Sequence, residues 1–516
     1  MKTFVCAGCA CLHGLVVGAN LAVSAGLEDG NATVYAWRGE KRVVWQDQTN
    51  RTEEPVLVRP MCEEAFVRVG VARPVRGDGD ILYADRVEWG GAALVGTGEV
   101  VRLVAEIAVP RMGALPASVS VKSPLGEVVC PLAVCERQFP EGNARRTFLD
   151  LWQHPWAVAR YYRVKPFSKE HYAKMRPLWT RLAEAGQKVV TATIMNRPWA
   201  HQCFDGYGSM VRHIKRTDGS WKFDYSVFDE YVKFAMDCGL GPQIHCYSVC
   251  PFRLKRYYWE DEKGRMQFAD FDVGSSEYLA YWEPFLKDFA QHLKTKGLFD
   301  QTYIALDERS PAELRTAYDL VKRCGGFKIA MAGDRRPEQF EGVEIDNFTI
   351  ALQCVTPDYI ASARTRRAAG KTTTVYVAGG NPCTGTAQPL VDCQWLGAYP
   401  GAVDLDGFLR WAYCSWPANP NSDSTYDPWF GHWSAGGTYL AYPSGPSMRC
   451  LALFNGLNLS EKLKILREEG KIDAELAAAL REFEYKGAKA YATYPAYAVL
   501  RKTEALVHAR SSASVK

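Results

Sequence analysis

The sequence lacks an excess of charge of either sign, and it lacks a long apolar run outside its N-terminal segment. Its 62 basic and 58 acidic residues are interspersed and leave a formal charge of +4. This balance excludes the dense basic surface that is typical of proteins that bind nucleic acids or acidic membranes. Beyond the N-terminal segment, no stretch approaches the roughly 20 apolar residues that span a bilayer. We therefore expect no nucleic-acid partner and no membrane span, and a neutral ligand fits the charge balance better.

A complete set of metal ligands is also missing, although the chain has 16 cysteines. Cys6, Cys9 and Cys11 resemble part of a metal cluster, but no second Cys/His pair completes a four-ligand set. Cys246 and Cys250 surround a predicted strand and are interpreted as buried, reduced packing residues. We therefore assign no metal.

The N-terminal segment has the pattern of a secretory signal. Residues 4–25 carry no charge, follow Lys2 and end in the small residues Val23-Ser24-Ala25. This pattern predicts a signal peptide over residues 1–25 and a periplasmic or secreted protein. Gly14 interrupts the apolar run, and the alternative is a buried N-terminal segment of a cytoplasmic enzyme. The number of free thiols favours that alternative.

Residues 26–140 have the pattern of an antiparallel β-sandwich. Gly, Pro and Asp turns separate short β-like runs, and no convincing helical pattern interrupts them. A linker is predicted at 137–146, where Pro140, Gly142 and Asn143 interrupt the pattern. The β-like runs are 32–37, 55–58, 65–69 and 100–104.

Residues 141–445 alternate between strand and helix patterns. Amphipathic helical stretches such as 169–185 and 228–238 fall between most of the strands. A (β/α)8 barrel of the TIM type is the economical fold for this α/β order, and residues 446–516 are predicted to form a C-terminal helical extension. The eight predicted strands are 147–152, 188–194, 243–247, 302–306, 328–332, 348–352, 372–377 and 407–411.

The fourth predicted strand ends at two adjacent acids, Asp307 and Glu308. In closed barrels the active site lies at the carboxyl ends of the strands, where the chain leaves its strict alternation and neighbouring side chains can both reach the mouth. Close carboxylates disfavour each other's ionisation, so that one can stay protonated at neutral pH and donate to a leaving oxygen. Cleavage of a glycosidic bond needs such an acid.

Adjacent acids alone do not specify this chemistry. Asp229-Glu230 and Asp261-Glu262 are also adjacent acids, and only the position at a strand end distinguishes Asp307-Glu308. The structural alternative is an ion pair with Arg309, because structural ion pairs also perturb acids.

Four stretches of sequence resemble glycoside hydrolase family 123, whose members are exo-acting N-acetyl-β-galactosaminidases with a catalytic barrel after an N-terminal sandwich. The resemblance runs over nearly the whole chain. Ser310 is one departure, since many relatives have Pro there, and it concerns loop shape rather than the acids. The matching stretches are Tyr35-Ala36-Trp37-Arg38-Gly39-Glu40, Leu149-Asp150-Leu151-Trp152-Gln153-His154-Pro155, Asp307-Glu308-Arg309, and Asp406 to Tyr413 followed by Trp416, Asp427-Pro428-Trp429 and Tyr442-Pro443.

This resemblance implies a retaining mechanism in which the substrate's 2-acetamido group is the nucleophile. Glu308 would protonate the departing oxygen and then activate water, and Asp307 would orient the acetamido group and stabilise the oxazoline-like intermediate. The spacing agrees, because adjacent side chains are too close to flank both faces of the bond as a separate nucleophile and acid. The resemblance further implies no cofactor and a glycan substrate with terminal GalNAc, on a glycolipid or a glycoprotein.

The strand ends and the loop after the eighth strand carry further residues of the kinds that bind sugar hydroxyls, an acetamido carbonyl or a pyranose face. The aromatic residues could equally pack in the core, His154 could be a structural histidine, and Asp427 could cap its loop. The candidate substrate-binding residues are Asn196, Tyr247, Gln353, Tyr376, Trp411, Tyr413, Trp416, Trp152, His154, Asp427 and Trp429.

Two other functions stay open at this point. One is a β-N-acetylglucosaminidase or chitinase-like hexosaminidase, because the two sugars differ in the orientation of one hydroxyl group. The other is a carbohydrate-binding protein that has kept the barrel without the chemistry, against which the intact acid pair argues.

Overall fold

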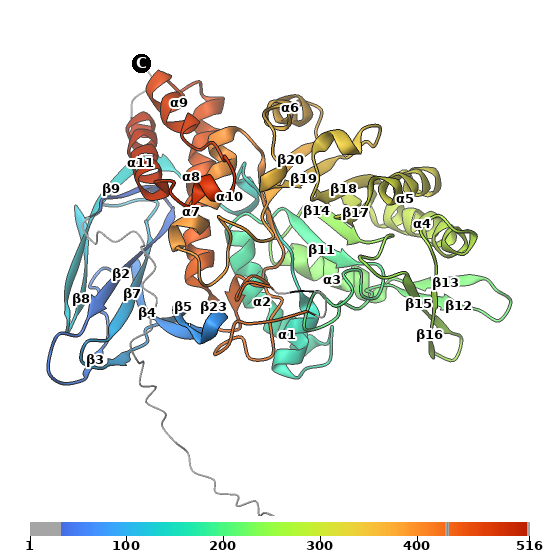
Figure 1. The fold of residues 1–516 in the computed structure, drawn as a ribbon, viewed down its shortest axis with the longest axis horizontal. Coiled ribbons are helices and arrows are strands. Elements are labelled where there is room, and N and C mark those ends of the chain that lie inside the picture. The colour runs from blue at the N-terminus through green and yellow to red at the C-terminus, as the bar shows by residue number, and fades with distance from the viewer. Residues whose placement is uncertain (1–31, 429–430, 432, 513–516) are drawn as a thin grey trace, which may run out of the picture.

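The computed structural model describes residues 32–428, 431 and 433–512 (Figure 1). The predicted signal peptide and Trp429 lie outside these residues. Among the helices of this part of the chain, none combines the length and the hydropathy needed to cross a bilayer.

Two facing sheets form the N-terminal part of the fold (Figure 1). A four-stranded antiparallel sheet has the order β2-β7-β4-β5, and a three-stranded sheet has the order β1-β9-β8. Val71, Leu103 and Val121 are buried together between them. The predicted sandwich is confirmed, with the difference that β1 pairs with β9 in parallel. The parallel pairing is possible because the rest of the sandwich forms the long crossover between these two strands.

The N-terminal elements were only partly predicted, since the predicted runs correspond to β1, β3, β4 and β7. Their bounds are β1 (Val34–Arg38), β2 (Lys41–Thr49), β3 (Val56–Val58), β4 (Val67–Arg76), η1 (Asp78–Asp80), β5 (Leu82–Trp89), β6 (Ala93–Val95), β7 (Val100–Ala108), β8 (Ser118–Ser123), β9 (Gly126–Gln138) and η2 (Gly142–Ala144).

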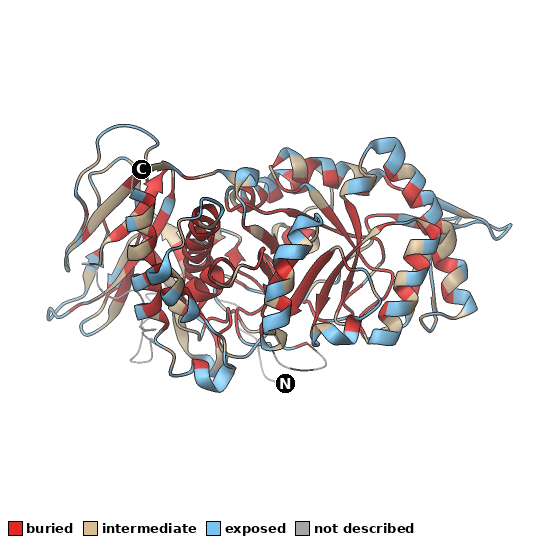
Figure 2. Cartoon of the chain, turned by 90° about the horizontal axis from the view of Figure 1, so that it is seen from above, coloured by how far each residue is buried: buried red, intermediate tan, exposed pale blue. Residues whose placement is uncertain are grey.

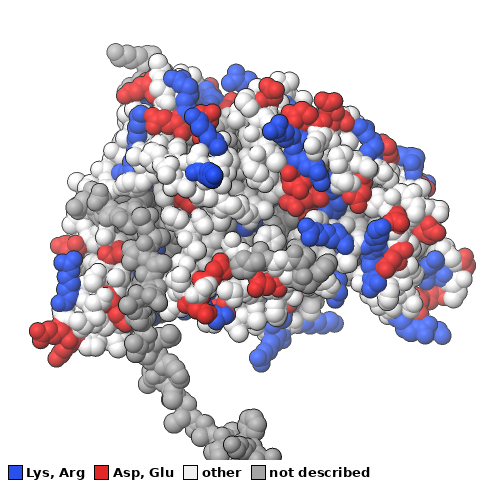
Figure 3. Space-filling model, in the orientation of Figure 1, with Lys and Arg blue, Asp and Glu red and all other residues white. Residues whose placement is uncertain are grey.

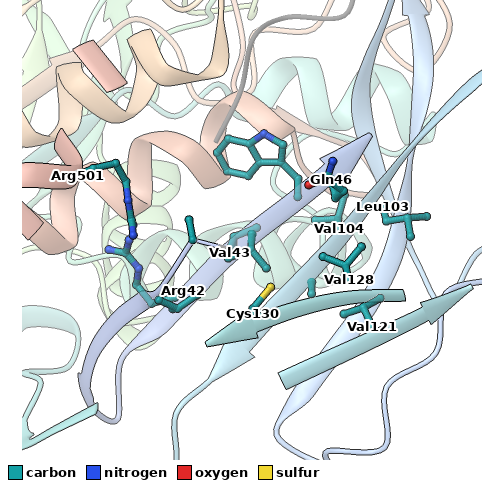
Figure 4. Close-up of a pocket in the computed structure, with 14 residues that line it drawn as sticks. Arg42, Val43, Gln46, Leu103, Val104, Val121, Val128, Cys130 and Arg501 are labelled. Atoms are coloured by element: carbon teal, nitrogen blue, oxygen red, sulfur yellow. The ribbon is translucent and has the colours of Figure 1, made fainter. Parts of the chain in front are cut away.

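A small apolar pocket lies between these sheets (Figure 4). Val43, Val104 and Cys130 are among its lining residues, and its volume is about 40 Å³. This is room for one or two water molecules. Arg501 closes one side, where its guanidinium donates to the Thr33 carbonyl oxygen at 2.6 Å. None of the lining residues is a predicted site residue, and we interpret the pocket as a packing gap.

Eight parallel strands form a barrel in the order β10-β21-β20-β19-β18-β17-β14-β11. A bridge between Leu149 and Gln187, and a 2.8 Å hydrogen bond from the Lys188 N–H to the Leu149 carbonyl, join β10 to β11. The barrel is therefore nearly closed, and all eight predicted strands are confirmed. Their bounds are β10 (Phe148–Leu151), β11 (Val189–Thr193), β14 (Gln243–Tyr247), β17 (Thr302–Asp307), β18 (Lys328–Gly333), β19 (Asn347–Ala351), β20 (Thr372–Tyr376) and β21 (Gly407–Arg410).

Helices cover the outside of the barrel. The helix before β17 illustrates why they form: the Ser275 hydroxyl caps its first turn by accepting from the Tyr278 N–H, and Gly297 ends it with φ of +70°. The barrel helices are α1 (Pro155–Tyr162), α2 (Lys169–Glu184), α3 (Ser226–Asp237), α4 (Ser276–Lys296), α5 (Pro311–Cys324), α6 (Pro357–Ala368) and α7 (Leu390–Val403), with short turns η3 (Phe299–Gln301), η4 (Pro337–Phe340) and η5 (Leu352–Cys354).

A small sheet extends from the barrel on the side opposite the N-terminal sheets (Figure 1). Its order is β13-β12-β15-β16, and its two hairpins follow barrel strands β11 and β14. Trp221 packs against Tyr281 of α4, with ring centroids 5.3 Å apart. The strand patterns of the sequence analysis did not predict this sheet. Its strands are β12 (Arg212–Lys215), β13 (Trp221–Asp224), β15 (Arg256–Asp261) and β16 (Met266–Asp270).

Helix α8 (Met448–Glu468) lies between the barrel and the N-terminal sheets and is buried along most of its length (Figure 2). It lies so close to α7 that a Cβ atom at Gly456 would stand 1.9 Å from the Gln394 carbonyl oxygen. Asn455 pairs with the backbone of Val43 in β2 through hydrogen bonds of 3.0 and 2.7 Å. The remaining elements are β22 (Ala441–Tyr442), β23 (Gly445–Pro446), α9 (Ala474–Arg481), α10 (Ala488–Tyr491) and α11 (Ala496–Ser512).

Buried ion pairs connect the N-terminal sheets to the C-terminal helices. Arg42 of β2 donates to Glu504 of α11 at 2.5 Å, and Lys462 of α8 lies 2.7 Å from Glu40. On the surface, the two signs of charge are interspersed over the face shown in Figure 3.

Candidate active site

The two predicted catalytic acids end β17, the fourth strand of the barrel in chain order. Tyr303 and Ala305 of this strand face the barrel interior, and Ile304 and Leu306 pack with the outer helices. Asp307 therefore continues the inward row. Strict alternation would turn Glu308 outward, but its φ of +26° breaks the alternation. Positive φ is uncommon for residues other than glycine and is often kept at functional sites.

The carboxylate of Glu308 points to the same side as the interior residues. The Tyr376 hydroxyl, at the end of β20, donates a 2.6 Å hydrogen bond to Oε1 of Glu308. The Glu308 N–H donates to the Ala332 carbonyl of β18 at 2.8 Å, which fixes the backbone. Asp307 and Glu308 therefore both lie at the carboxyl ends of the barrel strands, which we call the barrel mouth.

Both acids have raised pKa values. Burial, followed by the negative charge of Glu308, raises the pKa of Asp307 to about 7. Burial also raises the pKa of Glu308. The hydrogen bond from Tyr376 favours the ionised carboxylate and so lowers this pKa, but the effect of burial is larger. The positive charge of Arg309 opposes both shifts without cancelling either. Two adjacent acids that are shifted in this direction keep a proton toward neutral pH.

Arg309 acts mainly on the backbone rather than as a partner of the acids. Its guanidinium donates to the carbonyl oxygens of Asp307 at 2.5 Å and of Cys250 at 2.6 Å, and it lies over the ring of Phe252. It therefore ties β17 to the loop after β14. Ser310, the residue that departs from the family pattern, begins α5 with a capping box to Glu313, so this position shapes the helix start.

Four of the predicted substrate-binding aromatics meet in one cluster at the mouth. Trp152, Tyr247, Tyr376 and Trp411 are buried together with Ala305 and Ala332 of the barrel wall. Trp152 and Tyr247 have ring centroids 4.5 Å apart. They come from the ends of β10, β14, β20 and β21, so the closed barrel brings together residues that are far apart in sequence.

A polar layer lies directly below this cluster. The Trp152 indole N–H donates to the Asp150 carboxylate at 3.3 Å, and Gln187 lies 3.5 Å from the other carboxylate oxygen. Burial raises the pKa of Asp150 to about 7 and lowers the pKa of neighbouring His245 to about 3. The imidazole is therefore neutral, and Asp150 supports the position of Trp152.

Three other predicted residues pack away from the mouth. Tyr413 and Trp416 are fully buried in the main core, where the Tyr413 hydroxyl donates to the Leu178 carbonyl and the Trp416 indole donates to the Ala441 carbonyl. His154 is also fully buried, bonds to the Asp205 carbonyl at 2.9 Å and stacks on Tyr207. Core contacts already occupy these three side chains, so the structure does not bring them together with the mouth aromatics.

The remaining predicted residues lie in loops. Asn196 is half-buried in the loop after β11 and accepts from the Ser209 N–H at 3.0 Å. Gln353 is exposed in η5, after β19. Asp427 is exposed in the long loop after β21. The sugar-binding roles of these three residues stay predictions.

Two residues that the sequence analysis did not select also belong to the mouth. Trp199 packs on both Trp152 and Tyr247, and the proximity of its indole N–H lowers the pKa of Asp307. Asp334 follows β18 and its charge raises the pKa of both acids. Asp334 could have been found, because it follows a predicted strand as Asp307 does.

Within residues 32–428, 431 and 433–512, no group of three or more His, Cys, Asp or Glu side chains is arranged to hold a metal ion.

Comparisons with known proteins give a family and a fold. Residues 152–466, more than half of the chain, match the catalytic domain of glycoside hydrolase family 123. A solved family 123 glycoside hydrolase from Clostridium perfringens, described for glycolipid glycan hydrolysis, has a TM-score of 0.82 at 23% identity, over 93% of this chain and 93% of that chain. A pyruvate kinase from Cryptosporidium parvum has a TM-score of only 0.31 at 10% identity, over 66% of this chain and 74% of that chain, and carries no argument.

Curated protein sequences give no match to this chain. The family match extends from the end of β10 into α8, and it includes the acid pair and the four mouth aromatics. The chain belongs to glycoside hydrolase family 123 and is a glycoside hydrolase.

Proposed function

We propose that this enzyme removes terminal β-linked N-acetylgalactosamine from glycans by a retaining mechanism in which the 2-acetamido group of the substrate is the nucleophile. The observation that carries the proposal is that two consecutive carboxyl groups, both with raised pKa values, lie on the same side of the barrel mouth. An arrangement of separate acid and nucleophile needs carboxyl groups on opposite faces of the bond, about 5 Å or more apart. A nucleophile supplied by the substrate removes this requirement.

In the first step, Glu308 donates its proton to the glycosidic oxygen as the bond from this oxygen to the anomeric carbon breaks. The acetamido carbonyl oxygen attacks the anomeric carbon from the other face and forms an oxazoline-like ring. In its ionised form, Asp307 accepts a hydrogen bond from the acetamido N–H and stabilises the positive charge that develops on this group. The greater exposure of Glu308 suits contact with the leaving group, and the deeper position of Asp307 suits contact with the acetamido group.

In the second step, water attacks the anomeric carbon and Glu308 takes a proton from this water. The acetamide is restored, and two inversions give net retention. The raised pKa of Glu308 supports its first role, because a protonated acid must be available near neutral pH.

The proposed substrate is the glycan of a glycolipid or a glycoprotein. The Clostridium perfringens structure is described for glycolipid glycan hydrolysis, and we extend that substrate class to this chain as part of the proposal. A periplasmic or secreted location fits such a substrate and stays a prediction from the N-terminal segment.

Product analysis on a GalNAc-terminated oligosaccharide tests the proposal. We expect release of GalNAc, with the β-anomer formed first in an NMR time course. Paired nitrophenyl β-GalNAc and β-GlcNAc substrates test the sugar, and a nitrophenyl β-galactoside, which lacks the amide, tests the mechanism. Faster turnover of the GlcNAc substrate would favour the hexosaminidase alternative, and equal turnover of the galactoside or initial α-anomer would contradict substrate assistance.

A further inference from the structure

Asp334 is the first residue after β18, the strand that lies beside β17. Asp307 pairs with Ala332 in the register of the two strands, and the Glu308 N–H donates to the Ala332 carbonyl. Asp334 is two residues beyond Ala332, so the register places it next to Glu308 at the rim of the barrel. Its backbone is held there, because the Cys354 thiol donates to the Asp334 carbonyl oxygen at 3.1 Å.

The charge of Asp334 acts on several groups of the mouth at once. It raises the pKa values of Asp307, Glu308, Tyr376 and Cys354, which lie in or directly after β17, β20 and η5. The interaction between charges falls with distance. The carboxylate of Asp334 must therefore lie near all four groups, which belong to three separate parts of the mouth. This position agrees with the strand register, which also places Asp334 toward the mouth.

The carboxylate of Asp334 is open to a ligand. Its side chain is 41% exposed, and its ion pair is with the Arg335 guanidinium, which is 44% exposed and 3.7 Å away. An ion pair at this distance between exposed side chains is weak, and a ligand that offers better hydrogen-bond donors can replace it. An ionised carboxylate has only acceptor oxygens, and two sugar hydroxyls are the matching donors.

We propose that Asp334 is a third carboxylate of the active site, which accepts hydrogen bonds from hydroxyl groups of the sugar that Glu308 and Asp307 act on, and so contributes to the choice of sugar. The inference rests on the proposed function. GalNAc and GlcNAc differ in the orientation of one hydroxyl, and a site that hydrogen-bonds a hydroxyl discriminates strongly against a sugar that presents it wrongly. Asp334 provides such acceptors beside the general acid, where the sugar ring must lie.

The test compares Asp334→Asn and Asp334→Ala with the wild type. The matched control is Glu338→Gln, which removes one negative charge from η4, a few residues along the same exposed loop. We expect Asp334→Asn to raise KM for the nitrophenyl β-GalNAc substrate on the order of tenfold and to narrow the preference for GalNAc over GlcNAc, with a smaller loss of kcat. Asp334→Ala should give a larger effect, and Glu338→Gln should leave all three quantities unchanged.

The pH profile of kcat/KM provides a readout that a merely structural role would not move. Glu308 faces the charges of Asp307, Asp334, Arg309 and Arg253. Without the negative charge of Asp334, Glu308 loses its proton more easily. The basic limb should therefore move to lower pH in Asp334→Asn and stay in place in Glu338→Gln.

The outcomes separate the two proposals. Wild-type turnover of the GalNAc substrate, with Asp334→Asn equal to Glu338→Gln in KM, sugar preference and basic limb, overturns the inference alone. If the wild type binds the glycan without cleaving it, the proposed function fails, and the same comparison of variants is made on Kd by calorimetry. Equal Kd values then overturn the inference, a weaker Kd in Asp334→Asn supports it, and absence of wild-type binding overturns both. An unchanged melting temperature shows that the variants are folded.

Discussion

The hydroxyl of Tyr376 donates a 2.6 Å hydrogen bond to the carboxylate of Glu308, although the strands that carry these residues are three places apart in the barrel sheet. Tyr376 is buried and offers one donor, and Glu308 has the positive φ that aims its side chain at that donor. The bond therefore sets both the position of the proposed general acid and the ease with which it ionises.

Tyr376→Phe removes this donor while it keeps the ring in the aromatic cluster. A hydrogen bond to a charged group contributes about 1.5–3 kcal/mol, so we expect kcat/KM to fall about 10–100-fold. The donor lowers the pKa of Glu308, and the basic limb of the pH profile should therefore move to higher pH. Tyr318→Phe, in a half-buried tyrosine of α5, is the matched control. A Tyr376→Phe enzyme with the wild-type rate and pH profile would show that the bond has no role in the reaction.

Glu308→Gln removes the proton donor without changing the shape of the side chain. General acid catalysis contributes about 10²–10⁴-fold, and the contribution is greatest for leaving groups that need a proton. We expect a loss of this size on an oligosaccharide and a much smaller loss on a nitrophenyl substrate, measured as kcat/KM. The control is Glu230→Gln, in the Asp229-Glu230 pair outside the barrel mouth, and it should leave kcat/KM unchanged. Equal losses across leaving groups would contradict the acid role of Glu308.

The barrel could be predicted from sequence because its signals are local. Each strand is a short apolar run, and helices such as α5 have an amphipathic pattern with a Ser-Pro start and apolar residues at helical spacing. Helix α7 was not predicted, because it is buried on nearly all sides and has no polar face to give a period. Helix α8 is also buried along most of its length, but it lies in the segment that was predicted to be a helical extension. The small sheet β13-β12-β15-β16 was missed because its short strands lie in what resembled loops.

The site was predicted in part for the same reason. The acids at the end of β17 and the aromatics at the ends of β10, β14, β20 and β21 follow from the rule that functional residues lie at the carboxyl ends of barrel strands. Tyr413 and Trp416 pack in the main core, because the chain turns into the core after β21, and a residue count cannot show that turn. Trp199 could not be found from the sequence, since only the folded loop after β11 brings it onto Trp152.

Asp307→Asn should make the protein more stable at pH 8 and inactive. Burial raises the pKa of Asp307 to about 7, from an ordinary value near 4 in the unfolded chain. Between these values the unfolded chain has lost its proton and the native protein has kept it, so this group makes the wild type less stable as pH rises from about 4 to 7. The neutral amide avoids this loss, and we expect a gain of about 1–3 kcal/mol in unfolding free energy at pH 8, with no gain at pH 4. Urea denaturation at both values measures it, and an equal effect at the two pH values would contradict the raised pKa.

Arg449→Met should weaken the junction between the barrel and the N-terminal sheets. The Arg449 side chain is 1% exposed and donates to the Asp85 carboxylate of β5 at 2.9 Å, and it also donates to the Thr384, Gly436 and Tyr439 carbonyls. Its loss leaves a buried carboxylate without its cation, which typically costs about 3–5 kcal/mol.

Asp85→Asn in the Arg449→Met background separates the charge effect from the lost packing. Removal of the stranded charge should recover part of the lost stability, so the effects of the two substitutions should not add. Lys502→Met, which breaks the exposed pair with Glu482, is the control and should cost no more than about 1 kcal/mol. Urea denaturation compares the wild type, the two single variants, the double variant and Lys502→Met. A loss in Arg449→Met as small as that of the control would mean that the Arg449–Asp85 pair does not hold the two parts of the chain together.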